Sequence, residues 1–400
     1  MDSVHAPERS GTDLYLDYNG STPVHPLVLE AGLPFLGEEF ANPSAAHPAG
    51  LRARAAIEGA RETIAQGLGC RAGEIWFTSG GTESNNWALF GSLPRETRAH
   101  VVVSAIEHKS VLSAAHELEQ KGHRVTRVGV DASGAVRVRD VEHALCADTA
   151  LVSVMCANNE TGIVQPAREI GALCRSRGIR FHTDAVCTLG KLPVDVRELG
   201  CDLLSLSSHK LYAPKGLGVL FVREGVLLRP FVHGCGQQNG MRGGTENPFA
   251  VVAFARAFEL MQRGAFSSGR GVDALRGVDA LRDELWRGIE ERFPECRRNG
   301  LGASLPNTLN VHFPGCLGAD LQRELGRRGI SVASGAAASG GSPSHVLLAM
   351  GASDAEARCS VRFSLGAGTD AATVRAVLEA LEIAVPACSS LVTTPEGKSV

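Results

Sequence analysis

Long hydrophobic runs are absent from this chain of 400 residues. No stretch of about 18 consecutive apolar residues occurs, and residues 1–13 are polar and charged, without the apolar core of a secretion signal. An excess of basic charge is also missing, because the formal net charge is −3, and nucleic acid is therefore not an expected partner. These absences predict a cytoplasmic protein that does not bind or cross a membrane.

Closely spaced cysteine pairs are absent as well. The 11 cysteines include no Cys-x-x-Cys pair, which argues for reduced thiols and against a zinc ribbon or a disulfide framework, and no metal is expected. A chain that is 44% hydrophobic can bury a large core. We expect a large domain over 22–262, a smaller α+β domain from 1–21 and 263–385, and a disordered tail over 386–400.

Short β-rich runs alternate with helical segments between about residues 60 and 225. The expected strands are 75–78, 101–104, 151–155, 179–182, 203–207 and 218–222, and a helix is expected over 167–177. Such alternation predicts an α/β fold with a mostly parallel sheet that binds ligands beyond the carboxyl ends of its strands.

Four chemical features each follow one of these strands. A glycine-rich turn at 78–86 opens a helix and could cradle a phosphate, His108 could cover an aromatic ring, and Asp184 could pair with a ring nitrogen. Lys210 could form a Schiff base. Each has a simpler interpretation alone: a capped turn, a satisfied polar residue, a helix cap and a solvated lysine. Their occurrence together at the ends of strands in one sheet favours a cofactor site.

The sequence resembles the cysteine desulfurase and selenocysteine lyase family, which are class V, fold type I enzymes that use pyridoxal 5′-phosphate. The resemblance covers about residues 14–385. It is carried by these motifs in order: YLDYN at 15–19, NPS at 42–44, the glycine-rich turn, EH at 107–108, ANNETG at 157–162, HTD at 182–184, SHK at 208–210, YAPKG at 212–216, MRGGTEN at 241–247 and VRFSLG at 361–366.

The resemblance implies a role for each matching residue. Lys210 would bind the cofactor covalently and move the Cα proton, Asp184 would contact the ring nitrogen, and His108 would stack on the ring and act in catalysis. Asn159 would contact cofactor or substrate, and Arg362 would hold the substrate carboxylate. The phosphate would be bound by Gly81, Thr82, Ser207 and His209, together with Thr245 of a partner subunit. An obligate homodimer with shared active sites is therefore implied.

The sequence departs from the family at three places. Ala338 stands where a mobile loop of the family carries the cysteine that takes up sulfur as a persulfide, and a methyl group cannot do this. The short segment from Ala338 to His345 favours natural divergence over an engineered change of cysteine to alanine. Cys187 replaces a glutamine that contacts the cofactor, and Gln238 begins a Gln-Asn pair in place of a Glu-Arg-like pair.

Cys187 has three interpretations. As a cofactor contact, its thiol would be a poorer hydrogen-bond donor than glutamine and would alter the ring's electronics. It could instead serve as a substitute nucleophile, or be a small buried thiol that fills space.

We therefore expect a lyase that cleaves a Cβ–S, Cβ–Se or similar bond of an amino acid such as cysteine or selenocysteine. Without a loop cysteine, the leaving group would be released directly or passed to an acceptor protein. Three alternatives remain: an engineered form of an ordinary desulfurase, an enzyme of another Cα reaction such as epimerisation, transamination or γ-elimination, and a non-catalytic sulfur-transfer scaffold. Retention of Lys210, Asp184, His108 and Arg362 argues against the scaffold.

Overall fold

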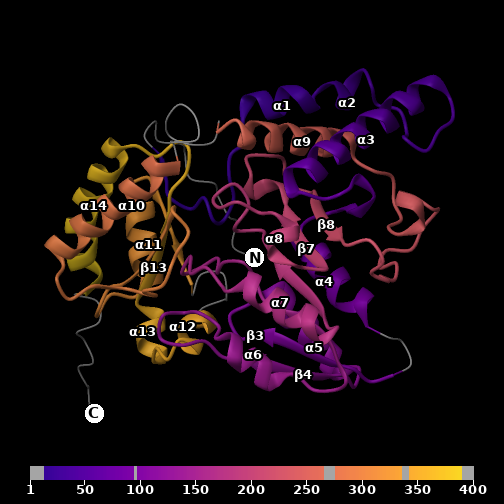
Figure 1. The fold of residues 1–400 in the computed structure, drawn as a ribbon. Helices are drawn as coiled ribbons and strands as arrows, with labels where there is room; N and C mark the ends of the chain where they lie inside the picture. The colour runs from indigo at the N-terminus through magenta and orange to yellow at the C-terminus, as the bar shows by residue number, and fades with distance from the viewer. Residues whose placement is uncertain (1–12, 94–96, 265–274, 336–341, 390–400) are drawn as a thin grey trace, which may run out of the picture.

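A seven-stranded sheet forms the centre of the larger part of the molecule (Figure 1). The computed structural model describes residues 13–93, 97–264, 275–335 and 342–389. The strand order is β2-β8-β7-β6-β5-β3-β4, and β8 alone in this sheet runs antiparallel to both of its neighbours. The strands are β2 (Ile75–Thr78), β3 (His100–Ser104), β4 (Arg124–Val128), β5 (Thr149–Ser153), β6 (Arg180–Asp184), β7 (Leu203–Ser207) and β8 (Gly218–Val222). The predicted α/β fold with a mostly parallel sheet is confirmed.

The edge strand β4 escaped prediction because its residues do not look like a buried strand. Its sequence RVTRV carries two arginines, and only Val128 is buried. An edge strand can keep charged side chains in water while its backbone pairs on one side only. The helix predicted over 167–177 is α7 (Ala167–Arg177).

Helices cover both faces of this sheet. Alternate residues of β3 show the two faces, since Val102 packs into one apolar cluster while Val101 and Val103 pack into another. The first cluster includes α1 (Pro26–Gly32), α3 (Pro48–Leu68), α6 (Val138–Ala144), α7 and α9 (Pro248–Gln262). The second includes α4 (Gly81–Ser92) and α5 (Lys109–Gln120). With both faces buried, polar groups converge where the strands end.

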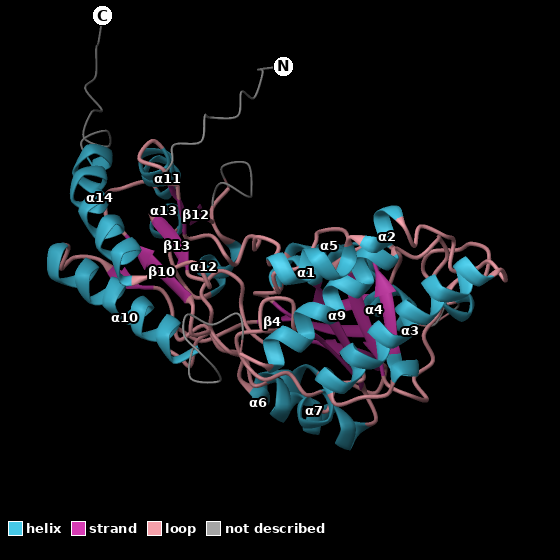
Figure 2. Ribbon diagram, turned by 90° about the horizontal axis from the view of Figure 1, so that it is seen from above, coloured by secondary structure: helices cyan, strands magenta, loops and turns pink. Residues whose placement is uncertain are grey.

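A second, smaller unit has its own sheet and core, as Figure 2 shows. Its antiparallel sheet has the order β12-β13-β10-β9, and β1 pairs separately with β11. The strands are β1 (Leu14–Tyr15), β9 (Arg297–Arg298), β10 (Thr308–His312), β11 (Ile330–Ser331), β12 (Ala333–Ser334) and β13 (Ser360–Ser364). Its main helices are α10 (Leu275–Arg292), α11 (Gly318–Gly326) and α14 (Ala371–Ser389). Leu16 lies in this core, so the start of the chain packs with its end.

Short helices complete the fold. They are α2 (Pro34–Gly37), α8 (Val196–Leu199), α12 (His345–Ala349) and α13 (Asp354–Arg358). Within the described ranges, no helix has the length and apolar character needed to cross a membrane.

Helix α14 continues beyond the point where the sequence predicted a disordered tail. It passes through Pro386 to Ser389, which corrects the start of that tail. Val385 and Cys388 are buried in the core of the smaller unit, and this packing outweighs the hydrogen bond that Pro386 removes. The rest of the predicted tail, 390–400, lies outside the described residues.

Candidate active site

A cavity of about 530 Å³ opens beyond the carboxyl ends of β3, β5, β6 and β7, facing the smaller unit. Ten of the predicted site residues line it: Gly81, Thr82, His108, Asn159, Asp184, Cys187, Ser207, His209, Lys210 and Arg362. Thr245 is exposed and does not line this cavity. Ala338 lies outside the described residues.

Asp184 ends β6 with its carboxylate almost fully buried, since 5% of the residue is exposed. Its Oδ1 accepts a hydrogen bond from the backbone amide of Val186 at 2.9 Å, and its Oδ2 accepts one from Asn85 Nδ2 at 2.7 Å. Donors thus hold both oxygens of this buried carboxylate. The carboxylate lines the cavity, where the nitrogen of a pyridine ring could pair with it.

Asn85 connects this carboxylate to His108 through Ser110. Its Nδ2 also lies 2.8 Å from Ser110 Oγ, and its buried Oδ1 has no hydrogen-bond partner among the described residues. The sequence offered a signal for Asn85, because it lies four residues after Gly81 on helix α4 and therefore on the same helix face. Sequence motifs alone do not predict this role of Asn85.

His108 caps helix α5 and faces the cavity. Its Nδ1 accepts a hydrogen bond from the Ser110 backbone amide at 3.2 Å and lies 2.8 Å from Ser110 Oγ. A backbone N–H can only donate, so Nδ1 carries a lone pair and Nε2 carries the proton of the neutral ring. Desolvation by the surrounding protein lowers the pKa of His108, although the ring keeps contact with the open cavity, and the positive charge of Lys210 acts in the same direction.

Lys210 lies in a single helical turn (Ser208–Lys210) directly after β7. Its Nζ donates to the backbone carbonyls of Asn19 and Gly20, the second at 2.7 Å. Burial is the main cause that lowers the pKa of Lys210. A buried amine of lowered pKa loses its proton more readily, which both Schiff-base formation and proton transfer require.

A further part of the cavity lining provides an anion cradle. Helix α4 begins at Gly81 with Thr82 in its first turn, and Ser207 and His209 line the same space. A Cβ on Gly81 would come within 2.8 Å of Val186 Cγ2, so glycine permits this close approach. Burial, aided by Lys210 and Lys215, lowers the pKa of His209 to about 4. The neutral imidazole and the helix N-terminus together suit a phosphate group.

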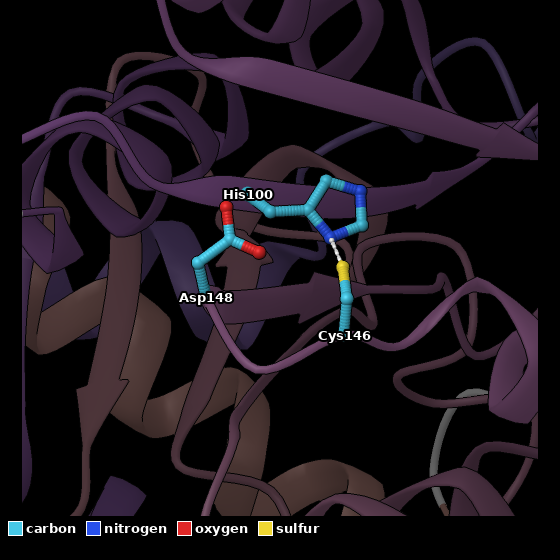
Figure 3. A group of neighbouring side chains, drawn as sticks. All are labelled: His100, Cys146 and Asp148. Carbon is cyan, nitrogen blue, oxygen red and sulfur yellow. Dashed lines mark hydrogen bonds between the residues drawn. The ribbon is translucent and has the colours of Figure 1, made fainter.

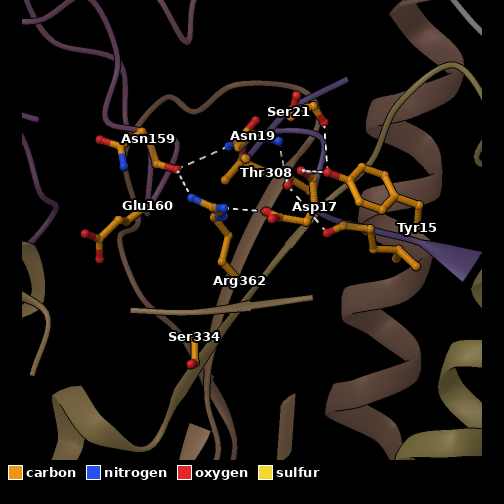
Figure 4. A network of polar contacts seen from close by, with 12 residues as sticks. Tyr15, Asp17, Asn19, Ser21, Asn159, Glu160, Thr308, Ser334 and Arg362 are labelled. Atoms are coloured by element: carbon orange, nitrogen blue, oxygen red, sulfur yellow. Dashed lines mark hydrogen bonds and ion pairs between the residues drawn. The ribbon is translucent and has the colours of Figure 1, made fainter. Parts of the chain in front are cut away.

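Arg362 reaches the cavity from β13 of the smaller unit, as Figure 4 shows. It donates from NH1 to the Asn159 carbonyl at 2.8 Å and from NH2 to Asp17 Oδ1 at 2.5 Å. Its Nε is buried without a hydrogen-bond partner among the described residues. A buried unpaired donor is costly unless a ligand accepts from it, and a carboxylate would do so.

The two other positions at which the sequence departs from the family, Cys187 and Gln238, lie in different parts of the structure. Cys187 is buried and lines the cavity, and its carbonyl accepts a hydrogen bond from Lys191 Nζ at 2.8 Å. Gln238 lies outside the cavity lining, where its side-chain amide pairs with the backbone N–H and C=O of Phe77 at 2.7 and 2.8 Å. It extends the hydrogen bonding of edge strand β2, so this departure does not border the proposed reaction centre.

These residues fit pyridoxal 5′-phosphate. The buried amine of Lys210, the hydrogen-bonded carboxylate of Asp184 and the glycine-rich helix start lie around one cavity. They would match the aldehyde, ring nitrogen and phosphate of that cofactor. Arg362 adds a cation with a free donor for a substrate carboxylate.

Comparisons with known proteins agree with this arrangement. The model of the aminotransferase class-V family matches residues 14–377. A curated relative, cysteine desulfurase IscS of Clostridium botulinum, is 40% identical over 375 residues, which cover 92% of this chain and 93% of that protein.

Solved structures show the same similarity. A NifS-like protein has a TM-score of 0.85 at 36% identity, with 93% of this chain and 99% of the other covered. The structure of SspA in complex with cysteine has a TM-score of 0.78 at 40% identity, with 88% and 99% covered.

Proposed function

The chain belongs to the aminotransferase class-V family of pyridoxal-phosphate enzymes, and we propose that it cleaves a Cβ–S or Cβ–Se bond of an amino acid such as cysteine or selenocysteine. Its cysteine desulfurase-like character follows from the relatives. The observation that carries the proposal is the convergence of Lys210, Asp184, His108 and Arg362 on one cavity. A scaffold without catalysis would not need a buried amine and a spare guanidinium donor in the same space.

Each residue has a distinct task in the proposed reaction. The bound cofactor would supply an electron sink for the substrate Cα. Lys210 would hold the cofactor and then move the Cα proton, while Asp184 would keep the ring nitrogen protonated. Arg362 would orient the substrate through its carboxylate, because its Nε is free to donate. His108 would donate from Nε2, since its Nδ1 is already an acceptor.

The fate of the sulfur distinguishes this chain within the proposal. Ala338 cannot take up sulfur, so the leaving group would depart as a free anion or pass to an acceptor protein. Selenide and sulfite leave more easily than sulfide. We therefore propose selenocysteine and cysteine sulfinate as better substrates than cysteine.

We also propose a homodimer with shared sites. Several large apolar side chains are exposed on and beside α1 and α2: Leu27, Leu33, Leu36 and Phe40 are 44%, 49%, 63% and 78% exposed. An apolar surface of this kind suits a protein interface. The exposed Thr245, which does not line its own cavity, is available to a partner's site.

Product analysis tests the reaction. The purified chain would be incubated with cysteine, selenocysteine and cysteine sulfinate beside an Ala338→Cys variant. We expect pyruvate and ammonium plus selenide from selenocysteine and alanine plus sulfite from cysteine sulfinate with the natural chain, and a protein persulfide from cysteine only in the variant. Racemised substrate or a keto acid without release of the leaving group would reject a lyase. Lys210→Ala is the control, and it should no longer retain the cofactor after borohydride reduction.

A further inference from the structure

A second cluster of reactive side chains, shown in Figure 3, lies where strands β3, β4 and β5 begin. The large cavity lies at the other ends of the strands. His100 begins β3, Arg124 begins β4, and Cys146 and Asp148 lie in the turn between α6 and β5. The five residues of β3 separate this cluster from the cavity end of the strand by about 13 Å. The cluster therefore has no place in the reaction proposed above.

His100 provides a base beside the thiol of Cys146. Its ring is fully buried, with Nδ1 3.0 Å from Cys146 Sγ and 2.8 Å from Thr149 Oγ1, and Nε2 2.8 Å from Thr126 Oγ1. When Nε2 donates to Thr126, Nδ1 is left as an acceptor for the thiol proton. Burial, and then the charge of Arg124, lowers the pKa of His100, so the ring is neutral near pH 7 and one ring nitrogen keeps its lone pair.

Arg124 places a positive charge against the same sulfur. One NH2 group lies 2.8 Å from Cys146 Sγ and 2.7 Å from Asp148 Oδ1. A guanidinium can only donate, so the sulfur is its acceptor and has the positive charge of Arg124 beside it when it attacks as a nucleophile. Asp148 shares the same cation, and the Ala144 carbonyl lies 3.8 Å from the sulfur. The Asp148 carboxylate and the Ala144 carbonyl place negative charge near the sulfur, so the proposed reactivity of the sulfur depends on the positive charge of Arg124.

Two other thiols, Cys156 and Cys174, lie in a different environment. Cys156 and Cys174 are fully buried, and burial raises the pKa of each to about 12. Cys146 is only partly buried, and the side chains of Arg124 and Asp148 beside it are 54% and 55% exposed. A small molecule in solution can thus reach it.

We propose that Cys146 is a reactive thiol site that exchanges with small soluble disulfides. The His100 ring takes the thiol proton, and the sulfur attacks one sulfur of the disulfide. A bond forms between Sγ and that sulfur, the original S–S bond breaks, and the second sulfur leaves as a thiolate that receives the proton. Cys146 is oxidised and the disulfide is reduced, with no further reagent. This proposal is independent of the reaction in the large cavity.

Competition between thiols within one chain tests the proposal. The cofactor-loaded protein would be treated at pH 7 with less than one equivalent of 4,4′-dithiodipyridine, and the labelled cysteines would be identified by peptide mass spectrometry. Cys146 should react about tenfold faster than the exposed Cys235, which serves as the internal reference. Equal or slower labelling of Cys146 would overturn the proposal.

Two charge variants separate reactivity from simple exposure. Arg124→Gln should slow labelling of Cys146 several-fold, whereas Asp148→Asn should leave it unchanged or faster because the guanidinium then serves the sulfur alone. An unchanged rate in Arg124→Gln would contradict the proposal.

A metal centre is the rival interpretation of the cluster. Equilibrium dialysis with Zn²⁺ alone would decide it, because retention of one ion per chain that is lost in Cys146→Ser would replace the proposed exchange site by a metal site. Cys146→Ser should leave cleavage in the large cavity unchanged.

Discussion

Among single residues, Glu107 is a carboxyl group whose pKa is raised far above its usual value. It is fully buried beside His108, where Ser104 Oγ at 2.5 Å and the Met155 amide at 2.8 Å both donate to Oε1, and Oε2 has no hydrogen-bond partner among the described residues. Desolvation raises its pKa from 4.5 to about 8. At neutral pH Glu107 is therefore a protonated carboxylic acid next to His108.

This raised pKa predicts a pH dependence of stability. The folded chain binds more protons than the unfolded chain between pH 4.5 and about 8, so the stability that Glu107 contributes is complete below pH 4.5 and is lost as the pH rises to about 8. Glu107→Gln stays neutral, so its free energy of unfolding relative to the natural chain should rise across this window, by at most about 1.4 kcal/mol per pH unit. Urea unfolding at several pH values measures it. A difference that does not change with pH would show that Glu107 is ionised in the fold.

Asn85 is a second residue that makes a testable prediction, because its side-chain amide contacts both Asp184 and Ser110. Asn85→Ala removes a donor to Asp184 and frees Ser110, so we expect cofactor binding to weaken by about tenfold or more, as the loss of a hydrogen bond to a charged group predicts. Fluorescence titration with pyridoxal 5′-phosphate measures this. Asn86→Ala is the matched control, since Asn86 donates to the backbone carbonyl of Thr82 and should be replaceable. Equal losses in both variants would mean that only helix α4 had been weakened.

Among the elements, strand β8 packs directly against the glycine turn that begins the anion cradle. A Cβ on Gly218 would lie 2.5 and 2.6 Å from the C and Cα atoms of Gly80, which are backbone atoms that cannot rotate away. The turn before α4 therefore rests directly on this strand.

Gly218→Ala should displace that turn and weaken binding of the cofactor phosphate, while overall secondary structure persists. The affinity for pyridoxal 5′-phosphate, with circular dichroism as a check of folding, tests this expectation. Gly59→Ala in helix α3 is the control, because its Cβ would meet nothing within 4 Å, and it should stabilise the chain by about 0.5–1 kcal/mol. Unchanged cofactor affinity in Gly218→Ala would remove the strand from this role.

At the scale of the whole molecule, the two units meet at the cavity. Arg362 of the smaller unit contacts Asn159 of the larger unit and Asp17 near the start of the chain. The site is thus assembled from segments far apart in sequence, and a partner subunit would complete it under our proposal.

The proposed dimer makes a prediction about assembly. The double change Leu36→Glu and Phe40→Glu places charges on the exposed apolar surface beside α2 and should yield monomers that hold the cofactor less tightly. Sedimentation velocity measures the assembly state. The control variant carries two charge reversals on exposed residues of helix α3, Arg52→Glu and Glu62→Lys. It shows whether altered surface charge by itself changes the assembly state. A dimer that persists in the leucine and phenylalanine variant would place the interface elsewhere.

Local patterns along the chain were enough for the fold class and for the main polar groups of the site. Each of the six predicted strands is present within two residues of its expected ends, and Asp184 is the last residue of its strand while Lys210 lies in the turn after its own. Asp17 and Asn19 lie in the YLDYN motif at 15–19, but this motif did not predict that they line the cavity. Their carbonyl and carboxylate groups matter only because β1 pairs with β11 and brings the start of the chain to the site.

The sequence alone thus determined which chemistry is available, because strand ends and helix starts position a lysine, an aspartate and a glycine turn through short-range geometry. Only the tertiary structure decided which groups touch. The contact between Asp17 and Arg362 spans 345 residues, and the meeting of His100, Arg124 and Cys146 depends on strand order. Such distances are set by how strands pair across the sheet, which no local pattern specifies.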